Sequence, residues 1–220
     1  MSKNEPRHAE EDSSPLRIAV LISGSGSNLQ ALIDASESGQ LPGVEIVLVV
    51  SNQADAVGLQ RALKHKLPAL YLPWKQREEA EARLIALLHL FQVDLIVLAG
   101  WMRIFTASFV TQFPCRIINL HPALLPDDGM SKTYVTSSGV EVPALRGLHV
   151  VKQALDADMK VTGSTVHYVT PEVDAGPVLC REEVTIEEGD TEETLHEQIK
   201  RVEHRLIVEA VKDLRGYIRQ

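Results

Sequence analysis

The sequence predicts an α/β protein built on a doubly wound, mostly parallel sheet with helices on both faces. Two observations point to this class. Segments with strand and helix patterns alternate from residue 16 to residue 121, which is the order of a chain of βαβ units. The strand-like segments, such as 93–100 and 115–121, are continuous apolar runs. Strands buried on both faces have this pattern, whereas strands with one exposed face alternate apolar and polar residues.

The first half of the chain supplies most of the predicted sheet. An apolar run at 16–23 enters a glycine-rich link, and the helix pattern at 27–39 stops at Gly39, a residue type that often ends helices. The following strands are expected at 44–52, 68–73, 93–100 and 115–121, with helices at 56–66 and 76–92 and a short helical piece before residue 115.

The second half has a different order of elements. Strand patterns at 162–170 and 176–186 are joined by a turn around Asp174, so we expect an antiparallel hairpin added to the parallel sheet. A long helix should begin at Asp190, with Glu193 completing a pair that resembles a capping box. Its apolar stripe runs through Leu195, Ile199, Val202, Leu206, Ala210 and Leu214.

We predict one domain at 16–220, preceded by a polar, disordered tail at 1–15. An insertion loop at 127–146 interrupts the strand and helix rhythm with Gly, Ser, Thr and acidic residues, although 132–136 and 140–145 could pair as a small hairpin. Loops of this length tend to be functional or disordered. A solvated excursion and a functional loop both stay open.

Composition excludes several functional classes. Of 220 residues, 45% are hydrophobic and 24% charged, and 22 Lys and Arg against 30 Asp and Glu give a net charge of −8. This balance argues against a nucleic-acid or anionic-membrane surface, and no apolar run is long enough to span a bilayer. Cys115 and Cys180 lie in apolar strand-like runs without metal-ligand spacing, so we expect buried, reduced thiols in a cytoplasmic protein.

The segment SGSGSN at 23–28 links the first strand to the first helix, where anions often bind. Its glycines, including Gly26, let the backbone approach an anion, Ser27 can cap the helix, and Asn28 adds an amide donor. A dinucleotide fingerprint would need glycine where Leu29 stands. The loop therefore favours a monophosphate over NAD, and a tight turn without a ligand is the alternative.

Polar residues gather where the later strands end. Asn119 and His121 project from one face of a strand because they are two residues apart, and Asp174 lies in the hairpin turn. An amide and an imidazolium can stabilise an oxyanion, and a carboxylate can raise the pKa of the imidazole or order a water. The pattern suits acyl transfer without a covalent intermediate. His167 could support this group or simply pack, and no histidine cluster has metal-ligand spacing.

Several segments resemble the phosphoribosylglycinamide formyltransferases of purine biosynthesis, and the resemblance runs in order from about residue 16 to 215. The Asn-x-His-Pro and Asp-x-Gly-Pro patterns are shared with the wider group of enzymes that use 10-formyltetrahydrofolate. The segments that carry the resemblance are VLISGSGSNLQALID (20–34), VLAGWMRIF (97–105), RIINLHPALLP (116–126), GSTVHYVTPEVDAGPV (163–178) and Glu203-His204.

The resemblance implies a Rossmann-like formyltransferase fold and transfer of formyl from 10-formyltetrahydrofolate, as co-substrate, to the amine of glycinamide ribonucleotide, with no metal, no NAD and a monomer or homodimer. Asn119, His121 and Asp174 would be catalytic. The remaining implied site residues are Gly26, Ser27, Asn28, Glu203, Met102 and Pro122 for the ribonucleotide, Arg77, Trp101, Arg103, Ile104, Phe105 and Asp174 for the folate, and His167 and Thr165 as candidate supporting residues.

Two features depart from the family pattern. The insertion at 127–146 replaces a short aromatic-Pro-Gly step, and Lys200 stands where a neutral polar residue is expected. Three alternatives stay open: a formyltetrahydrofolate hydrolase with water as acceptor, a non-catalytic nucleotide- or folate-binding module, and a Rossmann dehydrogenase.

Overall fold

The structure is a computed structural model that describes residues 14–218, so residues 1–13 of the expected tail lie outside the described part. It confirms the predicted fold class. Seven strands form one sheet in the order β3-β2-β1-β4-β5-β8-β9, and the first five in the chain are parallel. The strands are β1 (Leu16–Ile22), β2 (Val44–Ser51), β3 (Ala69–Tyr71), β4 (Leu95–Leu98), β5 (Ile117–His121), β8 (Val161–Tyr168) and β9 (Val178–Thr185).

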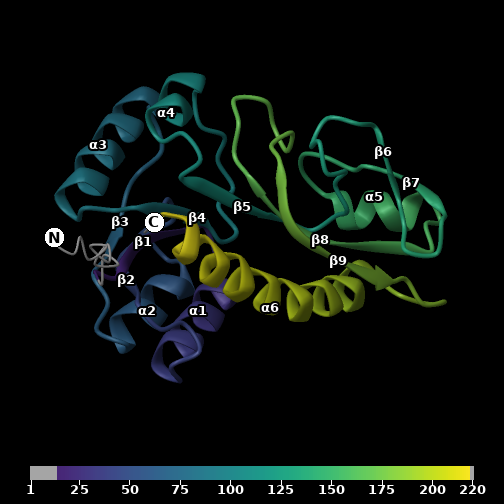
Figure 1. The fold of residues 1–220 in the computed structure, drawn as a ribbon, viewed down its shortest axis with the longest axis horizontal. Coiled ribbons are helices and arrows are strands. Elements are labelled where there is room, and N and C mark those ends of the chain that lie inside the picture. The colour runs from purple at the N-terminus through teal and green to yellow at the C-terminus, as the bar shows by residue number, and fades with distance from the viewer. Residues whose placement is uncertain (1–13, 219–220) are drawn as a thin grey trace, which may run out of the picture.

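Helices cover both faces of the sheet (Figure 1). Within β1, Ile18 and Val20 belong to the core that α1, α2, α5 and α6 complete, whereas Ala19 and Leu21 belong to the core completed by α3 and α4. Both faces of β1 are therefore buried, which explains its unbroken apolar sequence. The helices are α1 (Ser27–Glu37), α2 (Val57–Lys64), α3 (Arg77–Leu90), α4 (Ala107–Gln112), α5 (Val150–Asp156) and α6 (Glu192–Ile218).

The C-terminal hairpin is confirmed. Strand β8 pairs antiparallel with β5 and then with β9, so the hairpin extends the parallel sheet at one edge. His121 pairs with Thr165 and Asn119 with His167 in this register. The hairpin therefore brings predicted site residues from two distant segments side by side.

The insertion forms the small antiparallel hairpin that its sequence allowed, from β6 (Thr133–Val135) and β7 (Glu141–Pro143). It is docked on the domain. The Glu183 carboxylate on β9 accepts hydrogen bonds from Tyr134 Oη at 3.0 Å, Ser137 N at 2.7 Å and Ser137 Oγ at 2.8 Å. Arg181 also stacks over the Tyr134 ring at 4.6 Å.

Two local predictions are wrong. Cys115 is exposed and has a left-handed backbone, because β5 begins only at Ile117. Cys180 is half-buried, and burial raises the pKa of its thiol to about 12.

The start of α6 is also corrected. Thr191, rather than Asp190, accepts a hydrogen bond from the Thr194 amide, and Thr194 Oγ1 accepts one from the Thr191 amide. The capping box is therefore Thr191–Thr194, one residue later than predicted. Although α6 has 27 residues, no helix within residues 14–218 combines the length and apolar character needed to cross a membrane.

Candidate active site

The glycine loop after β1 is held by close backbone contact with α2. Gly26 has a left-handed φ of 68°, and a Cβ built on it would lie 2.6 Å from Gly58 Cα. Gly58 N donates to Gly24 O at 3.1 Å, and Arg61 Nε donates to Ser25 O at 2.9 Å. The loop is thus fixed in a shape that only glycine permits at position 26.

Two expectations for this loop need correction. Ser27 is the first residue of α1, so it does not occupy the cap position, which belongs to Gly26. Asn28 is buried, and its Nδ2 donates to Glu203 Oε2 on α6 at 2.9 Å. The Asn28 amide nitrogen therefore joins the loop to α6, and its Oδ1 is buried with no partner among the described residues.

The segment after β4 forms an apolar wall. Trp101 and Phe105 are buried and stacked, with ring centroids 5.9 Å apart, and Trp74 meets both rings edge-on. Met102 and Ile104 are exposed. Such a surface of stacked rings and exposed apolar side chains suits a flat aromatic ligand.

Ser23 joins this wall to the glycine loop. Its Oγ accepts a hydrogen bond from Met102 N at 2.8 Å and donates to Asn52 Oδ1 at 2.5 Å. Ser23 N also donates to Gly100 O at 3.1 Å. The ends of β1 and β4 are therefore locked together.

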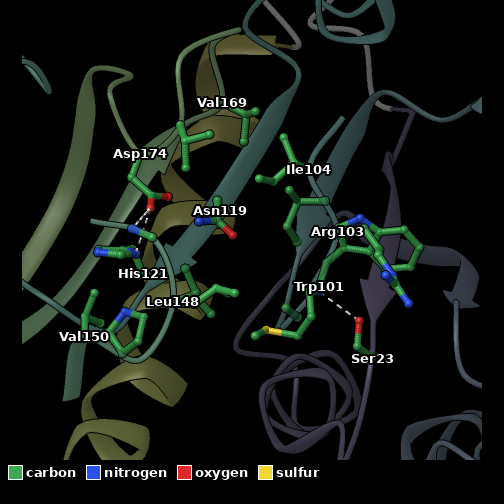
Figure 2. A pocket seen from close by; sticks show the side chains of 18 of the residues that line it. Ser23, Trp101, Arg103, Ile104, Asn119, His121, Leu148, Val150, Val169 and Asp174 are labelled. Carbon is green, nitrogen blue, oxygen red and sulfur yellow. Dashed lines mark hydrogen bonds and ion pairs between the residues drawn. The ribbon is translucent and has the colours of Figure 1, made fainter. Parts of the chain in front are cut away.

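A polar cluster faces the wall across the cavity (Figure 2). Asp174 is its centre: Oδ2 lies 3.5 Å from His121 Nδ1, and Oδ1 lies 3.6 Å from His167 Nε2. His167 Nε2 is in turn 3.2 Å from Asn119 Nδ2. The structure thus brings Asn119, His121 and Asp174 into one network, with His167 as the link.

Hydrogen bonds limit the roles of the ring nitrogens in this network. His167 Nδ1 donates to Tyr168 O at 2.8 Å, so Nε2 accepts from Asn119 Nδ2 in the neutral ring and donates toward Asp174 Oδ1 in the protonated ring. The second N–H of Asn119 is then available to a ligand. His121 Nε2 donates to Leu145 O at 2.7 Å, so both ring nitrogens of His121 face protein groups.

The pKa values of His121 and Asp174 are both lowered. Burial lowers the pKa of His121 below 6.5, and this outweighs Asp174 and the Leu145 carbonyl, which raise it. The Asp174 carboxylate thus raises the pKa of the imidazole, as a carboxylate can, but burial lowers it by more. For Asp174, burial would raise the pKa, but the His167 hydrogen bond, the His121 charge and the Gly147 amide together lower it.

Thr165 has a different position from the other predicted residues. It is fully buried, and its Oγ1 donates to Ala123 O at 2.7 Å and accepts from Leu125 N at 3.1 Å. It fixes the turn that follows His121 and Pro122, and it does not line the cavity. Its effect on the site is indirect.

A cavity of about 790 Å³ joins these parts. Apart from Thr165, every site residue expected from the sequence lines it: Gly26, Ser27, Asn28, Arg77, Trp101, Met102, Arg103, Ile104, Phe105, Asn119, His121, Pro122, His167, Asp174 and Glu203. Within residues 14–218, no three His, Cys, Asp or Glu side chains are grouped as metal ligands.

Sequence reasoning missed other lining residues. His196 lies on α6 two turns before Glu203, and Lys200 lies one turn before Glu203 on the same face. This helical spacing, counted back from Glu203, would have found His196. Ser23, the first residue of the segment SGSGSN, also lines the cavity, as do Trp74 and His149, for which the sequence carried no comparable signal.

Comparison with known proteins agrees with this geometry. The family model described as formyl transferase matches residues 16–211, so the chain belongs to the formyl transferase family. It is 37% identical over 192 residues to the phosphoribosylglycinamide formyltransferase of Escherichia coli, which covers 86% of this chain and 82% of that protein. Glycinamide ribonucleotide transformylase 1 from Symbiobacterium toebii superposes with a TM-score of 0.81 at 37% identity, covering 99% and 94% of the two chains.

Longer relatives match over one part of their length. The trifunctional purine biosynthetic protein adenosine-3 of Drosophila melanogaster is 43% identical over 192 residues, which is 86% of this chain. The chain spans between 13% and 19% of the length of the trifunctional relatives it matches.

Proposed function

We propose that this chain transfers the formyl group of 10-formyltetrahydrofolate to the primary amine of glycinamide ribonucleotide, a step of purine biosynthesis. One observation carries the proposal: a glycine loop at a helix N-terminus, an aromatic wall and a polar network of amide, imidazole and carboxylate line a single cavity. A phosphorylated amine and a folate that donates a formyl group need these three surfaces together. The similarity to named glycinamide ribonucleotide enzymes supports the same substrates.

The ribonucleotide phosphate binds at the N–H groups around Gly26 and Ser27, where the α1 dipole favours an anion. Glu203, held by Asn28, binds the sugar or glycinamide part, with Met102 and Pro122 beside it. The folate lies along Trp101, Ile104 and Phe105, bordered by Arg77 and Arg103. The formyl carbon then meets the amine beside Asn119.

The chemistry is direct attack. The neutral amine nitrogen bonds to the formyl carbon, and the carbonyl electrons move onto oxygen. Asn119, oriented by His167, donates its second N–H to this oxyanion. Such a preorganised donor is aimed at charge that develops only in the transition state.

His121 and Asp174 move the proton. Because its pKa lies below 6.5, His121 is neutral at pH 7 and takes the proton that the attacking nitrogen loses, at Nδ1 beside Asp174. The imidazolium formed there stabilises the oxyanion by its charge. Collapse of the intermediate breaks the carbon–N10 bond, and the proton passes to N10 of the departing tetrahydrofolate.

The test is the release of tetrahydrofolate, followed spectroscopically with and without glycinamide ribonucleotide. Release should require the ribonucleotide. Asn119→Ala, His121→Ala and Asp174→Asn should each lower turnover by roughly 10²–10³-fold, with folding checked by circular dichroism. Turnover within a few-fold of wild type in these variants would contradict the assignment.

The same assay separates the alternatives. Formyl loss in the absence of ribonucleotide would mean a hydrolase, and tight ligand binding without turnover would mean a binding module. NAD binding would favour a dehydrogenase. A cytoplasmic location and a monomeric or homodimeric state belong to this proposal and are tested by fractionation and by sedimentation.

A further inference from the structure

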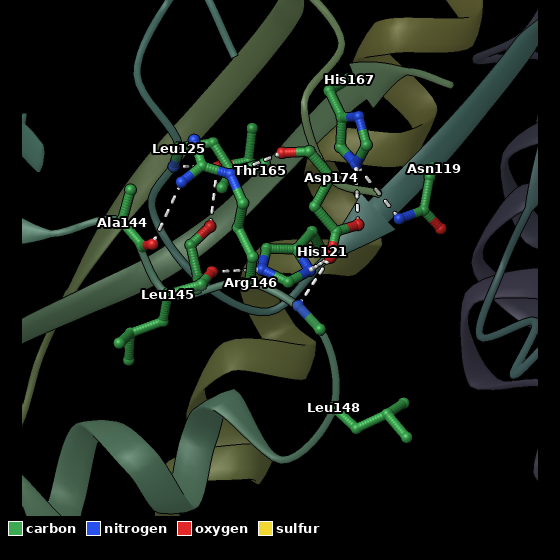
Figure 3. Close-up of polar contacts among 12 residues, drawn as sticks. Asn119, His121, Leu125, Ala144, Leu145, Arg146, Leu148, Thr165, His167 and Asp174 are labelled. Atoms are coloured by element: carbon green, nitrogen blue, oxygen red, sulfur yellow. Dashed lines mark hydrogen bonds and ion pairs between the residues drawn. The ribbon is translucent and has the colours of Figure 1, made fainter. Parts of the chain in front are cut away.

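The end of the insertion contacts both members of the proposed proton pair. Leu145 O accepts the Nε2–H of His121 at 2.7 Å, and Gly147 N donates to Asp174 Oδ2 at 2.9 Å. The tripeptide 145–147 therefore binds the imidazole on one side and the carboxylate on the other (Figure 3).

The middle residue of this tripeptide, Arg146, holds it in place. Its Nε donates to Asp174 O at 3.0 Å, and its Nη2 donates to Gly129 O at 2.8 Å and to Ser131 O at 2.9 Å. A rigid fork of donors can satisfy several carbonyls at once, which a lysine ammonium on a flexible stem does less well. One half-buried side chain thus joins the start of the insertion, its end and the turn that carries Asp174.

Backbone packing reinforces this junction. Gly129 has a left-handed φ of 66°, and a Cβ there would lie 2.3 Å from Gly176 O and 2.4 Å from Ala175 O. Asp174 itself has a φ of 50°, which costs energy outside glycine and persists only where the surroundings hold it. The insertion supplies those surroundings.

We propose that Arg146 is a positioning residue for the reaction: it holds segment 145–147 against the Asp174 turn, so that the Leu145 carbonyl and the Gly147 amide fix the ring of His121 and the carboxylate of Asp174. This inference rests on the proposed function. It also assigns the insertion a role, as a fixed wall of the site that acts through Arg146.

The proposal has a consequence for His121 that can be observed without turnover. With Nε2–H bound to Leu145 O, the neutral ring keeps its Nδ1 lone pair toward Asp174. The charged groups that face His121 are Asp174, His167 and Arg146. Releasing segment 145–147 would take the Leu145 carbonyl away from Nε2–H, so the ring would lose the contact that selects its Nε2–H tautomer.

The experiment compares Arg146→Met, which keeps length and loses every donor, with wild type. Nitrogen-15 NMR of the His121 ring should show one Nε2–H tautomer in wild type and a mixture of tautomers in the variant. Turnover should fall about tenfold or more, since small displacements of reacting groups are costly, while KM for either substrate changes less than about threefold. Arg146→Lys should restore part of the turnover.

Glu183→Ala is the matched control. It removes the three hydrogen bonds that hold the hairpin on β9 and leaves segment 145–147 untouched, so His121 and turnover should resemble wild type. Equal losses in Glu183→Ala and Arg146→Met would overturn the proposal, because general docking of the insertion would then explain both.

Three further results would also overturn it. These are an unchanged His121 spectrum in folded Arg146→Met, turnover within twofold of wild type, and faster turnover, which would mean that the segment blocks the site. If Arg146→Met does not fold, Arg146→Lys carries the same NMR comparison. Because the spectrum needs no substrate, absence of transferase activity in wild type would refute the proposed function separately.

Discussion

At the scale of single residues, backbone conformation decides where the site can form. Gly26 and Asp174 both have positive φ angles, one at the glycine loop and one at the proton pair. Glycine adopts this region without steric cost, whereas Asp174 adopts it in a turn that Arg146 and Gly147 contact. The two ends of the cavity thus depend on unusual backbone at two positions.

Gly26→Ala should disrupt the loop. The left-handed backbone costs about 1–2 kcal/mol for alanine, and the methyl group would lie 2.6 Å from Gly58 Cα, which adds about 1–3 kcal/mol of overpacking. We expect lower stability to urea and a higher KM for the ribonucleotide. Gly24→Ala is the control for stability, because a Cβ there meets nothing within 4 Å; equal losses of stability to urea in both variants would contradict the argument.

The pH dependence of kcat should reflect His121. The neutral ring accepts the proton, and burial places its pKa below 6.5. Turnover should therefore fall toward acid pH with a midpoint below 6.5, as the ring becomes protonated before the reaction. Asp174 raises this pKa, so the residual activity of Asp174→Asn should fall at still lower pH. A shift toward higher pH in that variant would refute the pairing.

At the scale of secondary structure, α3 positions the apolar wall after β4 through a buried carboxylate. Glu81 accepts hydrogen bonds from Thr106 N at 2.7 Å and Thr106 Oγ1 at 2.5 Å, and lies 3.6 Å from Arg77 Nε. Thr106 Oγ1 also accepts from Phe109 N at 3.1 Å and caps α4. One side chain thus ties α3, the end of the 101–105 segment and the start of α4 together.

Glu81→Ala should weaken both folding and folate binding. The half-buried Thr106 donors lose their acceptor, which costs about 1 kcal/mol, and Arg77 loses its partner beside the cavity. The expected results are a lower urea midpoint and a higher KM for the formyl folate, with the KM for the ribonucleotide unchanged. Glu79→Ala removes an exposed ion pair with Arg83 and should change neither, because exposed pairs contribute little.

At the scale of the whole molecule, sheet topology places the cavity. The order β3-β2-β1-β4-β5 reverses direction between β1 and β4, and ligands of open α/β sheets bind at such switch points. The glycine loop follows β1, the aromatic wall follows β4 and the polar network begins at the end of β5. Adjacent strand ends therefore deliver all three surfaces to one edge.

Ligands that fit this edge should stabilise the entire domain. At about 100 times its Kd, glycinamide ribonucleotide should add about 2.7 kcal/mol to the free energy of unfolding, measured by thermal unfolding. NAD at equal concentration should add nothing, since Leu29 replaces the third glycine of a dinucleotide loop. A shift with NAD and none with the ribonucleotide would contradict our interpretation of the loop.

Local sequence predicted the strands of the sheet well and the ends of the elements less well. The continuous apolar strands predicted the parallel sheet, because burial on both faces leaves a pattern within each strand. Because Asn119 and His121 are two residues apart in a strand, the sequence also predicted that their side chains project from the same face of the sheet. The errors arose at the ends of elements. Cys115 lies before the start of β5. The N-cap of α6 is Thr191 instead of Asp190, because a displacement of one residue changes which side chain accepts from a free backbone amide.

The sequence by itself determined the fold class and the order of the elements, because hydrophobic period is a property of neighbouring positions, and most of the expected cavity residues came from its resemblance to a known family. Only the tertiary structure decided the partners: Asn28 with Glu203, Asn119 with His167, and His121 with Leu145. These contacts join residues 24 to 175 positions apart, and the protonation of the site follows from them. No local pattern encodes which of two ring nitrogens meets a carbonyl.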